Sequence, residues 1–472
     1  MSALDLEGVY LRLPAWLQQA AVSLEGWRVE RRRYGRPFDA ALAACEDRAR
    51  WDAGRLAEWR DARLRAFVGA AASFPFYRRW FANSGAVPAD IRTLDDLRRL
   101  PVLTKDVVRE ALRDGTLSAP GAATFVAHTS GTTGAGLRFP VSAESMREQW
   151  AIWWRYRRAH GIQRGTWCGY FGGRSLVPPQ QMRPPFWRVN PPARQVMFSA
   201  YHLTPDTADA YVAELRRRSL PWLHGYPSIL ALIASYLRER GETLGYPVRW
   251  VTLGAENVLP GQAAAIEAAF GVPPRQHYGM AEAVANISEC PAGGLHVDED
   301  FAAVEFVGRP DGTSAIVGTN FTNAATPLIR YEVGDTATPS DRSCPCGRPG
   351  RLVAALDGRR EDYVVLPNGA RIGRLDHIFK DMESVREAQI VQRRRDALEV
   401  RFVKGRGFDA SAERTLREEF ARRLGTAIAI TFTSVDAVPR TPAGKLRFVV
   451  SELVDGAIDR PGLADDTAAR AS

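Results

Sequence analysis

The sequence predicts an α/β protein in which a large N-terminal α/β domain of several subdomains precedes a small α+β domain at the C-terminal end. Three observations support this class. The 472 residues exceed what one hydrophobic core usually supports. From about residue 123, short β-branched segments alternate with helical ones, which is typical of a sheet that binds ligands at its strand ends. Near residue 358 that order changes, which indicates a second domain.

The elements of the large domain follow from local patterns. Residues 1–120 are rich in Ala, Leu and Arg at helical spacing, so we expect several helices there. Helices are also predicted over 206–220 and 226–241, and the second ends at a glycine. Further predicted elements are strands at 248–256 and 274–279 and, between them, a helix at 260–271 that opens with Pro and ends in Gly.

The small domain begins with a hairpin predicted over 362–373, where Asn-Gly lies between two apolar runs. A helix from about Leu375, a strand at 397–403, a helix at 411–425 and a strand at 427–435 complete it. The predicted boundaries are 1–358 for the large domain, 359–361 for a hinge, 362–458 for the small domain and 459–472 for a disordered tail.

Composition narrows the class of function. With 45% hydrophobic and 25% charged residues, the chain is typical of a globular protein. It has no apolar run of about eighteen residues and no signal-peptide pattern, so we expect a cytoplasmic protein without a membrane span. The net charge of +9 does not predict nucleic-acid binding, because arginines are scattered among acids. A phosphate-bearing small substrate accounts for the same charge.

The segment HTSGTTGAGLRFP, residues 128–140, predicts a phosphate-binding loop. Its glycine spacing fits neither GxxxxGK[ST] nor GxGxxG. Strands are predicted on both sides, at 124–128 and 137–141, and the next helix is expected at a capping box over 145–148. Glycine lets the backbone N–H groups curl around an anion, and the hydroxyls add donors. The predicted phosphate contacts are Thr129, Ser130, Gly131, Thr132, Thr133 and Gly134. A solvated hairpin tip is the alternative.

Six further motifs follow the loop in order. They are LHGYPSIL (223–230), GAENV (254–258), HYGMAE (277–282), RYEVGD (330–335), GRRED (358–362) and PRTPAGK (439–445). The series resembles the adenylate-forming superfamily of acyl-CoA synthetases, firefly luciferase and peptide-synthetase adenylation domains, and the resemblance spans about residues 10–450. LRRLPVLTKDVVRE at 97–110, HGYPS and CPCG resemble its phenylacetate-CoA ligase branch, which includes coenzyme F390 synthetases and relatives found with capsule genes.

The resemblance implies the adenylate-forming enzyme fold and a two-step reaction. In such enzymes a carboxylic acid is activated by ATP as an acyl-adenylate, pyrophosphate leaves, and CoA takes the acyl group. Two alternatives stay open. In the first, adenylation is the same, but the acyl group goes to an amine or hydroxyl, or AMP itself is transferred. In the second, the chain is a non-catalytic scaffold that binds nucleotide.

The motif residues receive roles from this resemblance. Glu282 would hold Mg²⁺, a cation that prefers carboxylate oxygen. Tyr278 would stack on adenine, and Asp335 would accept hydrogen bonds from the ribose hydroxyls. Lys445 would bridge the attacking carboxylate and the α-phosphate. The remaining implied nucleotide contacts are Gly254, Ala255, Glu256, Gly279, Met280, Ala281 and Arg359.

Three positions depart from the family pattern. Glu361 lies at the hinge position, where Asp or Lys is usual. Ala281 replaces a Thr that touches the α-phosphate in most relatives, and Ala135 stands where Lys or a small polar residue is common. Because the hinge precedes the small domain that carries Lys445, the family's rotation between the two half-reactions is also implied, which makes the small domain mobile.

Two more sites are predicted, an acyl pocket and a metal site. Tyr170 and Tyr226 are assigned to the acyl pocket by analogy, with core packing as the alternative. Cys290, His296, Cys344 and Cys346 supply three thiolates and one imidazole, which suits a structural tetrahedral zinc. Unliganded buried cysteines are the alternative.

The expected cofactors are therefore ATP, Mg²⁺, structural Zn²⁺ and CoA. The expected partners are a small carboxylic acid, ATP, and CoA or an amine acceptor, without nucleic acid. A homodimer is left open.

Overall fold

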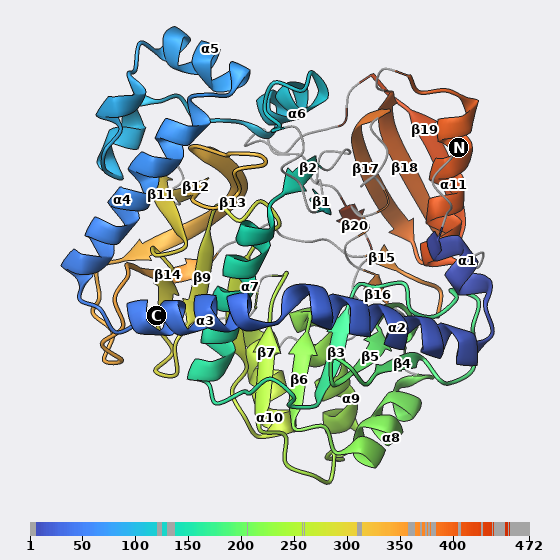
Figure 1. Ribbon diagram of the computed structural model, residues 1–472. Helices are drawn as coiled ribbons and strands as arrows, with labels where there is room; N and C mark the ends of the chain where they lie inside the picture. The colour runs from blue at the N-terminus through green and yellow to red at the C-terminus, as the bar shows by residue number, and fades with distance from the viewer. Residues whose placement is uncertain are drawn as a thin grey trace, which may run out of the picture.

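The structure is a computed structural model of the chain (Figure 1). It describes residues 6–119, 125–129, 137–204, 206–256, 258, 260–308, 314–356, 364–368, 371–372, 375, 378, 384–404, 407–425, 428–436, 438, 449–451 and 453. Over these residues, helices cover a large mixed sheet, and a smaller sheet with its own helix follows (Figure 1). The predicted α/β class is confirmed.

The chain begins with a group of helices, as predicted. Their bounds are α1 (Leu6–Arg12), α2 (Ala15–Arg33), α3 (Arg36–Arg48), α4 (Ala53–Ala71), α5 (Pro75–Ser84) and α6 (Lys105–Arg113), with the short 3-10 helices η1 (Pro88–Asp90) and η2 (Asp95–Arg99) before α6. Tyr77 of α5 is fully buried, and its hydroxyl donates to the Pro327 carbonyl and accepts from the Ile329 amide, each at 3.0 Å. Tyr77 therefore ties α5 to the connection between β12 and β13 of the large sheet.

Most described strands form one sheet with the spatial order β11-β12-β13-β14-β10-β9-β8-β7-β6-β3-β5-β4. They are β3 (Cys168–Gly172), β4 (Trp187–Asn190), β5 (Gln195–Ser199), β6 (Trp222–Gly225), β7 (Trp250–Leu253), β8 (Arg275–Gly279), β9 (Asn286–Glu289), β10 (Leu295–Val297), β11 (Ala302–Gly308), β12 (Ser314–Asn320), β13 (Tyr331–Ser340) and β14 (Leu352–Leu356). Strands β5, β3, β6, β7 and β8 run parallel. From β8 to β11 all neighbours are antiparallel, a half of the sheet that the sequence did not predict.

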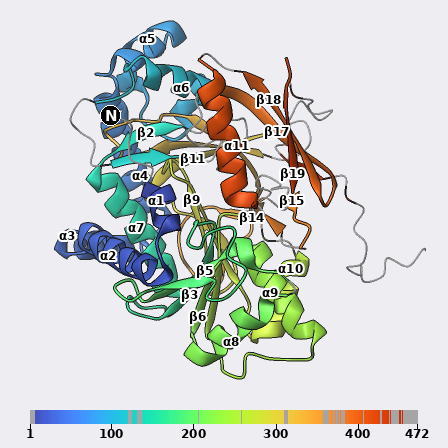
Figure 2. The same cartoon turned by 90° about the vertical axis from the view of Figure 1, so that its right-hand side faces the viewer.

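Helices lie on both faces of the parallel part. Helices α8 (Ala208–Arg218), α9 (Pro227–Glu239) and α10 (Pro260–Phe270) cover one face, and α2, α3 and α7 (Ala143–Ala159) cover the other (Figure 2). The helices predicted over 206–220, 226–241 and 260–271 are confirmed as α8, α9 and α10, and the two predicted strands as β7 and β8. Within the described residues, no helix combines the length and the apolar character that crossing a membrane requires.

The start of α7 corrects one prediction. The expected capping box began at Ser145, but the helix begins at Ala143 and its N-cap is Ser142, whose hydroxyl accepts from the Ser145 amide at 3.1 Å. Glu148 does not reach back to the cap. It pairs instead with Arg63 at 3.4 Å, because the side chain faces the neighbouring helix α4.

The two strands predicted around the glycine-rich loop are confirmed. β1 (Phe125–His128) and β2 (Arg138–Val141) form an antiparallel pair in which His128 lies opposite Arg138. Thr129 is buried and closes the base of the loop, since its amide donates to the Leu137 carbonyl at 3.0 Å and its hydroxyl accepts from the Leu137 amide at 2.8 Å. The loop residues 130–136 lie outside the described part of the chain.

A separate small sheet ends the fold, with strand order β19-β18-β17-β20. Its elements are β17 (Val385–Arg394), β18 (Ala397–Lys404), α11 (Ala410–Leu424), β19 (Ala429–Ser434) and β20 (Val449–Ser451), preceded by the hairpin β15 (Val364–Val365) and β16 (Arg371–Ile372). Buried apolar residues such as Val400, Leu416 and Phe420 form a core of its own, against which Tyr201 of η3 (Ala200–His202) packs. In Figure 1 this unit lies above the β3–β6 part of the large sheet.

The predicted hairpin, α11, β18 and β19 are confirmed, whereas β17 and β20 were not predicted. The helix expected from Leu375 falls mostly outside the described residues, as do the hinge at 359–361 and the tail at 459–472. The domain boundaries therefore stay predictions.

Candidate active site

The carboxyl ends of β6, β7 and β8 bring several predicted residues to one edge of the sheet. Because the strands are parallel neighbours, the residues that follow them lie side by side. The Gly254 amide after β7 donates to the Gly225 carbonyl of β6 at 3.3 Å. A Cβ atom on Gly225 would approach the Phe171 carbonyl to 2.3 Å, so only glycine fits between these strands. Ala255 follows with φ of 68°, a left-handed turn that takes the chain away from the sheet.

Tyr278 and Asp335 meet at this edge from distant parts of the sequence. Tyr278 lies in β8 and Asp335 in β13, and the tyrosine hydroxyl donates to Asp335 Oδ2 at 2.8 Å. Glu282, just after β8, is buried and accepts from the hydroxyl of Tyr331 of β13 at 3.3 Å. Its carbonyl accepts from Asn320 Nδ2 at 3.3 Å. The segment after β8 therefore lies against β12 and β13.

The carbonyl of Met280, a neighbouring predicted residue, accepts a hydrogen bond from Gln149 Nε2 at 2.7 Å. This bond ties the segment after β8 to α7. Ala281 is exposed and Glu256 is half-buried. The predicted residues Ser130, Gly131, Thr132, Thr133, Gly134, Arg359, Glu361 and Lys445 lie outside the described residues. Their roles stay predictions.

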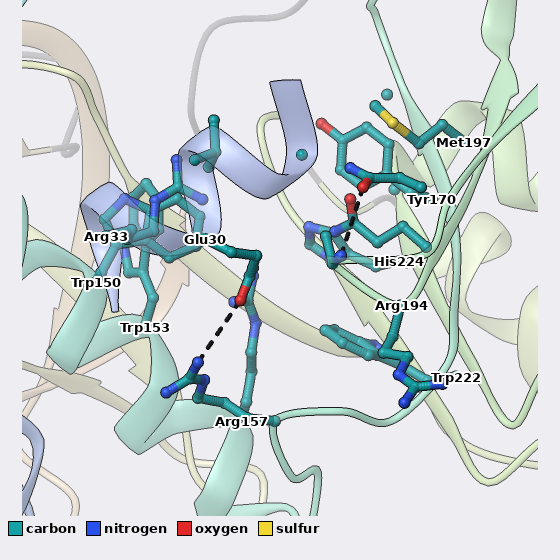
Figure 3. Close-up of a pocket in the computed structure, with 18 of the residues that line it drawn as sticks. Glu30, Arg33, Trp150, Trp153, Arg157, Tyr170, Arg194, Met197, Trp222 and His224 are labelled. Atoms are coloured by element: carbon teal, nitrogen blue, oxygen red, sulfur yellow. Dashed lines mark hydrogen bonds and ion pairs between the residues drawn. The ribbon is translucent and has the colours of Figure 1, made fainter. Parts of the chain in front are cut away.

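A cavity of about 670 Å³ lies beside this edge, between the sheet and the helices α2 and α7. Gly254, Ala255 and Gly279 line it together with Tyr170 and Tyr226, the two residues predicted for the acyl pocket. Figure 3 shows Arg33, Trp150 and Trp153 on one side of the cavity and Tyr170, Met197, His224 and Trp222 on the other. Aromatic side chains thus lie on both sides of the cavity, which suits an acyl group with a flat or apolar body.

Two histidines of the cavity are held neutral. Burial lowers the pKa of His224 to about 3, helped by the nearby Arg157 guanidinium, and the same two causes lower the pKa of His277 to about 3. His224 Nδ1 lies 3.1 Å from the Thr252 carbonyl and 2.9 Å from the Thr252 hydroxyl, and these contacts fix the orientation of the ring.

A hydrogen-bond chain leads from the cavity to the antiparallel part of the sheet. Asn286 Oδ1 accepts from His277 Nε2 at 2.8 Å and from Trp153 Nε1 at 3.1 Å. The amide of the same side chain donates to the buried Asp298, which Arg348 and Arg155 also contact. Because Asn286 uses its oxygen for two donors and its nitrogen for a carboxylate, the orientations of His277 and Trp153 are fixed.

Arg348 also belongs to the predicted metal site. Cys290, His296, Cys344 and Cys346 offer ligand atoms that all lie within 4.8 Å of one another. The Cys290 and Cys344 sulfurs are 3.5 Å apart, and Cys346 Sγ is 3.3 Å from His296 Nε2. Tetrahedral ligands 2.0–2.3 Å from a zinc ion are about 3.3–3.8 Å apart. The spacing therefore fits a single tetrahedral ion.

The surroundings of the cluster fit a metal as well. The amides of Gly294 and Arg348 donate to the sulfurs of Cys290 and Cys346 at 3.3 and 3.4 Å, as in many thiolate sites. A Cβ on Gly294 would come within 2.8 Å of the Cys344 sulfur. Burial lowers the pKa of His296 to about 4, so its imidazole is in the neutral form that binds metals.

The sequence did not reveal Arg33, Arg157, His224, His277 or Asn286 as site residues. His224 and His277 lie within quoted motifs, and their strand positions, two residues before Tyr226 and Gly279, place each pair on one face of the sheet. That alternation was an available signal. No spacing in the sequence links α2 to α7, so the two arginines could not be found in the same way.

Comparison with known proteins agrees with this fold. Residues 364–452 match the family described as the CapK C-terminal domain. Protein CapK of Staphylococcus aureus is 26% identical over 458 residues, covering 95% of this chain and 100% of that protein. Phenylacetate-coenzyme A ligase of Thermus thermophilus is 25% identical over 435 residues, covering 84% of this chain and 95% of that protein.

Among solved structures, a 2-hydroxyisobutyryl-CoA ligase in complex with 2-HIB-AMP and CoA superposes with a TM-score of 0.54 and 21% identity, covering 86% of this chain and 91% of the other. This likeness concerns the fold. Together with the sequence relatives, it shows that the chain is similar over most of its length to adenylate-forming CoA ligases, among them the phenylacetate-CoA ligases.

Proposed function

We propose that this protein activates a carboxylic acid with ATP as an acyl-adenylate, releases pyrophosphate, and then transfers the acyl group to CoA. The observation that carries the proposal is the meeting of Tyr278, Asp335 and Glu282 at the carboxyl edge of the sheet, beside a cavity lined by Tyr170 and Tyr226. An aromatic ring, a carboxylate that can accept from ribose hydroxyls and a second, buried carboxylate are there adjacent to a space for an acyl group.

Each of these residues has a chemical task in the first half-reaction. The Tyr278 ring offers a face for adenine, and the Asp335 carboxylate accepts from hydroxyl groups. Glu282 would hold Mg²⁺, which supplies charge neutralisation at the phosphates when it is bound. The loop with Thr132 and Thr133 would add donors where negative charge grows on the leaving pyrophosphate.

Two further parts of the proposal rest on the sequence. Lys445 would lower the repulsion between the attacking carboxylate and the α-phosphate. Rotation of the small domain about Glu361 would then remove the lysine and admit the thiol. Ala281 supplies no side-chain hydroxyl at its position, so backbone groups must take over any α-phosphate contact there.

We also propose that the Cys/His cluster holds one structural zinc ion and that the protein acts in the cytoplasm. The ligand set of three sulfurs and one imidazole supports zinc, since these are the donors of closed structural sites. The relatives named as CoA ligases favour CoA over an amine as the acceptor. The homodimer left open by the sequence stays a prediction, to be decided by sedimentation.

The test is carboxylate-dependent pyrophosphate release over a panel of aromatic and aliphatic acids. We expect release with a subset of acids and consumption of the acyl-adenylate when CoA is added. Release that proceeds to product only with amines would replace CoA by an amine acceptor. No release with any acid, from protein that binds ATP, would favour the scaffold alternative.

A further inference from the structure

The cavity beside the sheet carries more positive charge than the activation of one carboxylate requires. Its lining includes Arg33, Arg157, Arg164, Arg174 and Arg194, against Glu25 and Glu30 as the acids. His224 and His277 are neutral, so these two rings neither add to the positive charge of the arginines nor offset it. Two of the arginines differ from the rest in how their charge is accommodated.

Arg157, near the end of α7, has aromatic neighbours and no acidic partner among the described residues. Its guanidinium lies 5.0 Å from the Trp154 ring centre and 5.3 Å from that of Trp222. No carboxylate of the described residues forms an ion pair with it. Burial lowers its pKa, which shows that water solvates it poorly. A desolvated cation is costly unless an anion approaches it.

Arg33, at the end of α2, is held in a similar way. Its guanidinium lies 3.5 Å from the ring centre of Trp150, the indole that Arg157 approaches to 5.8 Å. The Nε of Arg33 is buried and has no hydrogen-bond partner among the described residues. By contrast, Arg164 faces Glu30 at 3.6 Å and Asp39 at 3.7 Å. Glu30 thus pairs with Arg164, whereas the Nε of Arg33 has no hydrogen-bond acceptor among the described residues.

The position of Arg157 along the sheet separates it from the reacting end. Trp222, beneath Arg157, opens β6, and Gly225 closes it at the carboxyl edge. Three residues of extended chain span about 10 Å. Trp222, His224 and Tyr226 are two residues apart, so their side chains point to the same face of the sheet. They form a wall of the cavity that runs from Arg157 to the carboxyl edge of the sheet. An acyl group about one aromatic ring long fits between these two ends.

We propose that the acid activated by this protein carries a second anionic group, held by Arg157 and Arg33 at the far end of an aromatic cavity while its other carboxylate faces the sheet edge. The substrate class is therefore an aromatic dicarboxylic acid or a related aryl acid with a second negative charge. The tryptophans stack on the ring, and the guanidiniums bind the distal oxygens through charge-assisted hydrogen bonds. This inference rests on the proposed function for its reaction, but its binding step is independent of ATP.

The test compares matched acids that differ only at the distal position: phenylacetate, 4-carboxyphenylacetate and the neutral 4-carbamoylphenylacetate. Binding without ATP is measured by calorimetry, and kcat/KM by pyrophosphate release. For the unmodified protein we expect the dianion to bind and react about 10- to 100-fold better than either monoanion. Arg157→Gln should remove that preference, whereas Arg157→Lys should retain part of it.

The matched control is Arg158→Gln, at the next position of α7, where the arginine points to Glu46 at 3.1 Å and does not line the cavity. It should keep the preference for the dianion. Equal affinities for all three acids, or a preference that survives Arg157→Gln, would overturn the inference while leaving adenylation intact. The inference would also be overturned if Arg157→Gln changed only the KM for CoA. Arginine-dependent binding of the dianion without any pyrophosphate release would instead uphold the inference and overturn the proposed function.

Discussion

At the scale of single residues, the hydrogen bond between Tyr278 and Asp335 is the contact that best relates sequence motifs to chemistry. The two residues are far apart in the chain, yet the hydroxyl and the carboxylate are 2.8 Å apart. The bond orients the carboxylate at the strand edge and leaves it with further lone pairs for other donors. The ring and the carboxylate therefore have separable roles.

Those roles predict different kinetic effects. Asp335→Asn should raise the KM for ATP by about 10- to 100-fold, because a carboxylate acceptor of two hydroxyls is lost. Tyr278→Phe keeps the ring and should raise that KM by no more than about threefold. Steady-state kinetics with saturating acid measure both. Equal effects of the two substitutions would mean that the pair acts only through folding.

The histidines of the cavity predict a pH dependence of stability. The folded-state pKa of His277 is about 3, below the ordinary value of 6.5, and His224 is similar. Between these values the unfolded chain binds more protons than the folded one, so the free energy of unfolding must fall as the pH falls from 6.5. Each histidine contributes at most about 1.4 kcal/mol per pH unit in this window.

Urea unfolding at pH 7 and pH 5.5 measures this dependence. His277→Asn should unfold with a shallower pH dependence than the unmodified protein, even if its stability is lower at both pH values. The change in slope is the result that matters, since a packing defect alone would shift both values equally. Identical slopes would mean that the pKa of His277 does not change on folding.

At the scale of elements, the Cys/His cluster joins two segments of the antiparallel sheet. Cys290 and His296 flank the turn between β9 and β10, while Cys344 and Cys346 lie in the connection between β13 and β14. From the same connection, Arg348 contacts Asp298, which holds Asn286 and through it His277. The cluster therefore supports one wall of the cavity from behind.

This arrangement predicts that metal binding contributes mainly to stability. Protein purified without chelator should contain about one zinc per chain by elemental analysis. Cys344→Ser should lower the free energy of unfolding by more than about 3 kcal/mol, because a ligand that closes a long connection is lost. The adenylation rate of the protein that remains folded should change much less. Zinc-free protein with undiminished stability would show that no metal stabilises the fold at this cluster.

The same scale shows where the sequence was informative. Helices α9 and α10 were predictable because Pro opens each and an apolar pattern follows. The start of α7 was placed three residues late, since Ser142 and Ser145 are equally good caps by residue type and only the structure shows which hydroxyl accepts. β17 escaped prediction because its second half, ending in Gln392, Arg393 and Arg394, is polar, although the strand is central in its sheet. Tertiary pairing, and not local propensity, decides such a strand.

At the scale of the whole molecule, the motifs predicted the sheet edge, whereas the substrate cavity depended on the fold. Gly254, Tyr278 and Asp335 belong to motifs of the sequence. The parallel strands explain why residues from such motifs lie together at one edge of the sheet. Arg33 and Arg157 meet on Trp150 only because α2 and α7 cross the same face of the sheet. No local pattern records that crossing. The reaction class was thus predictable from the sequence, whereas the proposal of a second anionic group on the acid required the packed structure.

Substitution of Lys445 tests directly whether this chain forms an acyl-adenylate. Single-turnover formation of acyl-adenylate from ATP and a responsive acid is compared between the unmodified protein and Lys445→Ala, and chemically made acyl-adenylate is then offered to both with CoA. We expect the variant to lose about 100- to 10,000-fold in the first half-reaction, because a positioned charge is removed from the reacting centre, and to complete the second normally. An undiminished first half-reaction, or equal loss in both, would contradict this expectation.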